Sequence, residues 1–190
     1  MTRVAPAVFD DLPETTQAVL REGESLMGFM PNDALVMAHR PALLLAFLGL
    51  VRAAYGDGPV SSDLKRLIGL VASREAQCGY CVAHTVHGAQ RLGVPLDKLN
   101  ALCDFEHSDR FTPAEKAALT VAAAAARVPN AVTDQQMATL REHYDAAAQV
   151  DILGVIGLFG FLNRWNATLR TSVESAPAAA LAQQDHTLAP

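Results

Sequence analysis

Apolar residues recur at helical spacing along almost the whole chain, and runs that alternate apolar with polar residues are nearly absent. Pro41 lacks a backbone N–H, so it is expected to bend or split the second helix. The pattern indicates one all-α domain over residues 1–174 with no internal repeat. It predicts about eight helices, near residues 13–27, 33–54, 62–76, 79–92, 96–104, 113–127, 134–143 and 146–170.

Local signals support the ends of several of these helices. The sequences TPAE, from Thr112, and TDQQ, from Thr133, have the form of a capping box, in which the first and fourth residues satisfy each other's backbone N–H groups. Ser61 stands where an N-cap is needed, and Val128-Pro129-Asn130 interrupts the chain between two helices.

The last predicted helix, QVDILGVIGLFGFLNRWNATL, is apolar around most of its circumference. A helix of this kind must be buried on nearly all sides. In a domain of 190 residues, a subunit interface would supply the extra burial, so we expect a homo-oligomer, either a dimer or a trimer of dimers. The tail over 175–190, with its alanine, proline and glutamine, is expected to be disordered or to act as a docking arm.

The net charge of −5 argues against non-specific binding to nucleic acid or anionic lipid. The N-terminus lacks the apolar core of a signal peptide. The longest apolar runs, 42–51 and 152–162, fall short of the roughly 18 residues that a membrane helix needs. With three cysteines in a chain of this kind, we expect reduced thiols in a cytoplasmic protein that has no membrane or nucleic-acid partner.

The stretch EAQCGYCVAHTVHGAQRLG, residues 75–93, is the strongest chemical candidate. Cys78 and Cys81 stand three residues apart at a predicted helix start, where they are close enough to form a disulfide. Unpaired N–H groups and the helix dipole favour thiolate there. His84 follows by nearly one turn and can take or return a proton. A thiolate, a second thiol and a base are the minimum parts for reducing a peroxide through a sulfenic acid and a disulfide.

Spacing alone leaves three interpretations open: a redox dithiol, a zinc site or a structural pair. Zinc needs four converging ligands. Cys78, Cys81, His84 and His87 would span about 13 Å along one helix. Zinc is therefore the weaker alternative, and no metal is expected. Cys103, beside Leu102, is expected to be a buried small hydrophobe.

Beyond spacing, SREAQCGYCVAHTVHGAQRLG resembles the core of the alkylhydroperoxidase-D (AhpD)/carboxymuconolactone decarboxylase family. GFMPNDALVMAHRPALL and LFGFLNRWNATL resemble its peroxidase-related branch, so that the resemblance covers roughly residues 25–170. It implies an AhpD-like, oligomeric helical bundle with the CxxC core at about 62–93 and the active site near a subunit interface.

The resemblance also implies roles for particular residues. Cys81 matches the family's peroxide-reactive cysteine, and Cys78 matches the partner that exchanges with a reductant. The best-known members have a histidine at the place of Thr85 and a glutamate at the place of Arg66. Glu75 is the candidate carboxylate to take over the proton relay.

The leading prediction is a thiol-dependent peroxidase or disulfide oxidoreductase of the peroxiredoxin type, with Cys81, Cys78, His84 and Glu75 as its site. It would reduce a hydroperoxide, need no bound cofactor, and be re-reduced by an external dithiol or lipoyl protein. One alternative is a non-enzymatic oligomer whose thiols sense redox state or only pack. Another is a carboxymuconolactone-decarboxylase-like enzyme acting on a small carboxylic acid or lactone, with His84 as base.

Overall fold

The computed structural model describes residues 2–184, and within them it contains helices and no strand. Two short 3-10 helices, η1 (Phe9–Asp11) and η2 (Ala101–Asp104), supplement the α-helices. The α-helices are α1 (Glu14–Met27), α2 (Asn32–Met37), α3 (Pro41–Tyr55), α4 (Ser62–Glu75), α5 (Gly79–Arg91), α6 (Leu96–Asn100), α7 (Pro113–Ala126), α8 (Asp134–His143), α9 (Ala146–Leu169) and α10 (Ser175–Ala182).

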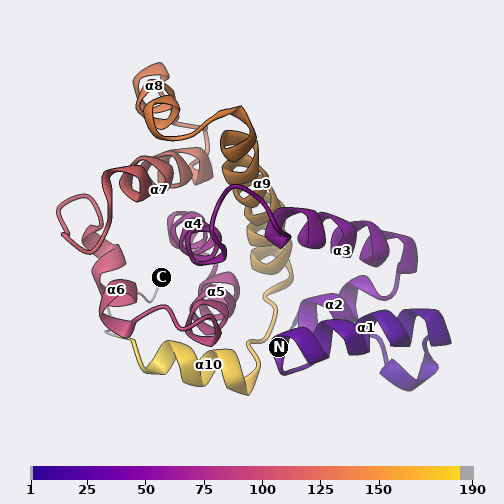
Figure 1. Cartoon of the computed structure of the whole chain (residues 1–190). Helices are drawn as coiled ribbons and strands as arrows, with labels where there is room; N and C mark the ends of the chain where they lie inside the picture. Colours follow the sequence, from indigo (N-terminus) through magenta and orange to yellow (C-terminus); the bar gives the residue numbers. More distant parts are fainter. Residues whose placement is uncertain (1, 185–190) are drawn as a thin grey trace.

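The helices α4 and α5 lie in the middle of the molecule, with α7, α9 and α10 around them (Figure 1). Most of α4 is buried, from Leu67 to Ser73 without interruption. It approaches α9 so closely that a side chain at Gly69 would collide with the Phe159 ring. The fold therefore fixes the start of α5 between a buried helix and a long apolar one.

The predicted all-α fold is confirmed, and each predicted helix is present with ends close to those expected. Pro41 splits the second predicted helix into α2 and α3, because it occupies the first position of α3, where its missing N–H costs nothing. The capping boxes at Thr112 and Thr133 are both formed. These ends were predictable because each depends on residues within one turn of the helix start.

The C-terminal tail contains a helix that the sequence did not predict. Residues Ser175–Ala182 form α10, which packs along α5. Pro177 and Ala180 are buried there, and the Gln90 amide donates to the Ala180 carbonyl at 3.4 Å. For this part of the tail the expectation of disorder is wrong and the docking arm is the better description, because a short apolar face meets α5. Residues 185–190 lie outside the described residues.

The long helix α9 would satisfy the length and apolarity of a membrane span, but here its inner face packs on α4, α5 and α7. Its outer face exposes Val150, Leu153 and Phe161, while the neighbouring helix α3 exposes Leu45 and Leu50. The predicted homo-oligomer would cover such a surface, and it remains a prediction.

Candidate active site

The two cysteines of the CxxC motif meet at the start of α5. Cys78 is the N-cap residue of this helix and Cys81 lies in its first turn. Gln77 adopts a left-handed conformation, with φ of 54°, which turns the chain sharply between α4 and α5. The two sulfur atoms are 2.8 Å apart, and each cysteine is only 2% exposed. The motif therefore forms a buried pair of sulfur atoms within hydrogen-bond distance.

Thiolate is favoured on Cys78 rather than on Cys81. The hydrogen bond with the Cys81 thiol, aided by the backbone N–H groups of Cys81 and Tyr80, outweighs burial and lowers the pKa of Cys78. Burial and the neighbouring Cys78 sulfur raise the pKa of Cys81. The thiolate that the sequence predicts at this helix start is therefore favoured at Cys78. The N-cap position, nearest the free amides of α5, belongs to Cys78.

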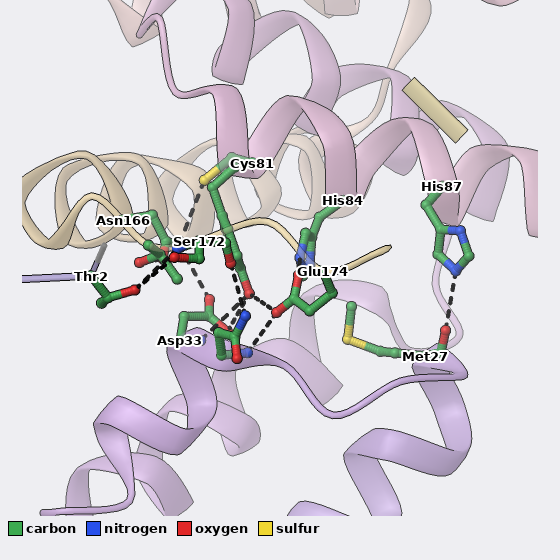
Figure 2. Close-up of polar contacts among 12 residues, drawn as sticks. Thr2, Met27, Asp33, Cys81, His84, His87, Asn166, Ser172 and Glu174 are labelled. Carbon is green, nitrogen blue, oxygen red and sulfur yellow. Dashed lines mark hydrogen bonds and ion pairs between the residues drawn. The ribbon is translucent and has the colours of Figure 1, made fainter. Parts of the chain in front are cut away.

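His84 lies one turn beyond Cys81 and contacts a carboxylate from the far end of the sequence. Its Nε2 atom is 2.7 Å from Oε2 of Glu174, the residue just before α10 (Figure 2). Burial opposes ionisation of Glu174, but the His84 contact and the Asn32 N–H hold the pKa of this carboxyl below its usual range. A carboxylate that accepts from Nε2 leaves Nδ1 as the ring atom that can exchange a proton with a substrate.

A second buried carboxyl group is linked to the first through a tyrosine. The Tyr80 hydroxyl oxygen is 2.9 Å from Oε1 of Glu174 and 3.1 Å from Oδ1 of Asp33, on α2. Burial raises the pKa of Asp33 above its ordinary value, although the charge of His84 opposes this. We refer to Asp33, Tyr80, Glu174 and His84 as the Asp33 chain.

Asn166, on α9, joins the Asp33 chain to the dithiol (Figure 2). Its Nδ2 group donates to Oδ2 of Asp33 at 3.2 Å and to the Cys81 sulfur at 3.7 Å. The Thr171 hydroxyl donates to the Asn166 carbonyl oxygen at 2.7 Å, which fixes the orientation of the amide. Three separated segments, from α2, α9 and the start of α10, thus converge on α5.

Other candidates from the sequence lie elsewhere. Glu75 forms an ion pair with Arg127 at 3.2 Å, and the carboxylate on His84 is Glu174 instead. The Arg66 guanidinium stacks over the Tyr55 ring, with its carbon 4.0 Å from the ring centroid. His87 lies further along α5 than His84 and contacts the Met27 carbonyl at 3.2 Å (Figure 2).

Cys103 corrects a further expectation, because it is exposed and not buried. It lies in η2, where the adjacent Leu102 takes the buried position. For the zinc alternative, the residues between 2 and 184 include no group of three or more histidine, cysteine, aspartate or glutamate side chains that could hold a metal.

The sequence pattern did not identify Asp33, Glu174 or Asn166 as site residues. Asp33 and Asn166 stand inside GFMPND and FLNRWN, two of the segments that carried the family resemblance. Their place in these segments was the signal that could have identified Asp33 and Asn166. Glu174 had none, because its place depends on the docking of α10.

Fold and site together define an AhpD-like all-α protein with a buried CxxC dithiol at a helix N-terminus. The model of the carboxymuconolactone decarboxylase family matches residues 41–124. The chain is also 35% identical to the debrominase Bmp8 in its apo crystal structure, with a TM-score of 0.89 over 96% of this chain and 97% of the other. The chain belongs to this family.

Two other relatives extend the comparison. A peroxidase-related protein from Ralstonia eutropha JMP134 with an AhpD core has a TM-score of 0.83 at 23% identity, over 93% of this chain and 94% of that one, which shows the shared fold. YnjA of Escherichia coli K12 is 36% identical over 104 residues, or 53% of this chain. That match spans 57% of YnjA, so this chain matches only part of the length of that relative.

Proposed function

We propose that the protein is a dithiol-dependent reductase, which gives two electrons from Cys78 and Cys81 to a small electrophile and becomes a disulfide. The observation that carries the proposal is the pair of buried sulfur atoms 2.8 Å apart beside the Asp33 chain. The fold and the family support an enzyme whose activity is that of the peroxidase-related proteins or similar to it. The dithiol supplies the electrons, and His84 handles the proton that each reduction requires.

The proposal assigns attack to Cys78 and resolution to Cys81, the reverse of the roles implied by the family resemblance. A thiolate is the nucleophilic form of cysteine, and the N-cap environment favours it on Cys78. Cys81 keeps its proton until the second step, because burial and the Cys78 sulfur raise its pKa.

A hydroperoxide is the first proposed substrate class. The Cys78 thiolate attacks the terminal oxygen, the O–O bond breaks, and the departing alkoxide takes a proton from His84. Cys78 is then a sulfenic acid. The Cys81 sulfur attacks it, the S–S bond forms, and hydroxide leaves with the Cys81 proton as water. An external dithiol or lipoyl protein would return two electrons and two protons.

A halogenated aromatic compound is the second candidate, favoured by a specific similarity. A crystal structure of the debrominase with one cysteine replaced by alanine contains 2,3,4-tribromopyrrole, and this chain is 34% identical to it over 96% of its length. In such a reaction the Cys78 thiolate would take the halogen while the carbon receives a proton. Cys81 would then displace halide from Cys78, forming the disulfide and releasing the thiol proton.

Turnover assays on both substrate classes test the proposal. Consumption of cumene hydroperoxide and of a polybrominated pyrrole is measured with dithiothreitol as reductant, in wild type and in Cys78→Ser, Cys81→Ser and Cys103→Ser. We expect turnover of at least one substrate in wild type and Cys103→Ser, and loss in the other two. Turnover that survives both CxxC substitutions, or no turnover of either substrate, would overturn the proposal.

A further inference from the structure

The Asp33 chain holds more hydrogen-bond acceptors than its visible donors can satisfy. The Tyr80 hydroxyl carries one proton but lies within hydrogen-bond distance of two carboxyl groups, Asp33 at 3.1 Å and Glu174 at 2.9 Å. If both acids were ionised, one of these contacts would set two oxygen lone pairs against each other. Such an arrangement in a buried site is costly, so the geometry requires one additional proton.

The environment of the two acids shows which one carries that proton. Glu174 accepts the Asn32 N–H at 2.6 Å through Oε1 and contacts His84 through Oε2. Both of its oxygens therefore face donors, as a carboxylate requires. Asp33 is 7% exposed, and no cationic side chain bonds it directly among the residues 2–184. The additional proton therefore belongs to Asp33.

The amide of Asn166 shows which oxygen of Asp33 is protonated. Thr171 donates to the Asn166 carbonyl, so the NH2 group of this amide faces Oδ2 of Asp33 and the Cys81 sulfur. Oδ2 is therefore an acceptor. The proton lies on Oδ1, which faces the Tyr80 oxygen, and the Tyr80 proton is directed to Glu174.

We propose that Asp33 works as an uncharged carboxylic acid that fixes the direction of the hydrogen bonds from Tyr80 through Glu174 to His84. It is a positioning residue, because it acts on the dithiol site through Tyr80 and Asn166 and not on the substrate. This inference rests on the proposed function. Its consequence is that an amide, which has one acceptor and one donor in the same places, keeps the two hydrogen bonds that Asp33 forms with Asn166 and Tyr80.

Ionisation of Asp33 at higher pH would break this arrangement. The raised pKa of Asp33 keeps its proton above the ordinary carboxyl range. The titratable groups that face it are Tyr80 and His84 from α5, Glu174 before α10, and the two cysteines. As pH rises through the Asp33 pKa, the new charge opposes thiolate on both cysteines and competes with Glu174 for the Tyr80 proton. Turnover in wild type should then decline.

The test compares Asp33→Asn with Asp33→Ala. We expect Asp33→Asn to keep more turnover at neutral pH than Asp33→Ala and to lose the decline at higher pH. Asp33→Ala leaves Tyr80 and Asn166 without their partner, and we expect it to lower turnover by about tenfold to a hundredfold. The infrared carbonyl band of a carboxylic acid should be present in wild type at neutral pH, absent in Asp33→Asn, and unchanged in the control Asp63→Asn.

Two results would overturn the inference: an Asp33→Asn variant that folds but is as impaired as Asp33→Ala, or a wild-type protein without the carboxylic acid band. The infrared measurement needs neither substrate nor the alanine variant. If the band behaves as expected but wild type reduces no substrate, the proposed function fails while the protonation of Asp33 stands.

Discussion

Two buried polar clusters in this protein have similar burial and opposite charge balance. Lys65, on α4, is 1% exposed and donates through Nζ to the Gly56 carbonyl at 2.8 Å and to Asp151 at 3.0 Å. One cation there meets one anion. In the Asp33 chain, two carboxyl groups share one histidine and one phenol.

The difference indicates what each cluster is for. A buried pair with matched charge and satisfied donors holds a fixed geometry, and removing one partner leaves an uncompensated charge. The unmatched cluster takes up one additional proton, on Asp33, and this directs Tyr80 and Glu174 toward His84, the group that exchanges protons beside the thiols. We therefore assign the Lys65 pair to stability and the Asp33 chain to chemistry.

The largest expected effect is on chemistry at the dithiol. Cys78→Ala should lower turnover by about a thousandfold or more, because the variant has no attacking sulfur and no partner for a disulfide. The folded structure should remain, as judged by circular dichroism and thermal unfolding. Steady-state assays with the substrate found active for wild type measure the effect, and a Cys78→Ala variant with near-normal turnover would refute the assignment.

The Lys65 pair should show the opposite pattern. Lys65→Met should lower the free energy of unfolding by about 3–5 kcal/mol, because Asp151 stays behind as an unpaired charge. Turnover per folded molecule should not change. Urea unfolding measures the free energy of unfolding. Steady-state assays, normalised by an active-site titration, measure turnover per folded molecule.

Lys98→Met is the matched control for this substitution. Lys98 pairs with Glu115 at 2.6 Å, but its side chain is 24% exposed, so we expect a loss of at most about 1 kcal/mol. Equal losses in the two lysine variants would contradict the distinction between a buried pair and a partly exposed pair.

Substitutions of the two candidate glutamates, Glu174 and Glu75, should differ in their effect on turnover. Glu174→Gln removes the carboxylate that holds His84 and should lower turnover by about tenfold, since general acid–base catalysis contributes about a hundredfold or more and the imidazole itself remains. Glu75→Gln removes only an exposed ion pair with Arg127 and should leave turnover unchanged. If Glu75→Gln were the more impaired variant, the assignment of Glu174 would be wrong.

The smallest effect concerns the pH dependence of Cys78. Its reactive form exists above its pKa, which the Cys81 thiol lowers, so alkylation should stay fast below the ordinary thiol range and slow as pH falls through the lowered pKa. Cys81→Ala removes that hydrogen bond and should raise the Cys78 pKa toward its ordinary value. The rate of iodoacetamide modification against pH measures the shift, and a downward shift would contradict the account.

The parts predicted correctly from the sequence depend on short stretches of chain. The helix ends at Thr112 and Thr133 follow from capping within one turn. Cys78 and Cys81 come together because their spacing places them one turn apart at the start of α5, and His84 follows one turn later on the same helix.

The parts predicted wrongly depend on how distant segments pack. Glu75 is three residues from Cys78, but the left-handed turn at Gln77 separates them, and Glu75 ends α4 facing Arg127. Glu174 reaches His84 only because α10 docks on α5, a contact between residues 90 positions apart. Local pattern carries no information on such contacts without an alignment or a structure.

The most direct test of the account follows the sulfur atoms during turnover without an added reductant. Reduced wild-type protein is mixed with substoichiometric cumene hydroperoxide or a polybrominated pyrrole, and its peptides are mapped by mass spectrometry. We expect one Cys78–Cys81 disulfide for each substrate molecule consumed, with Cys103 unmodified. Substrate consumption that leaves Cys78 and Cys81 as thiols, or a disulfide that involves Cys103 instead, would contradict it.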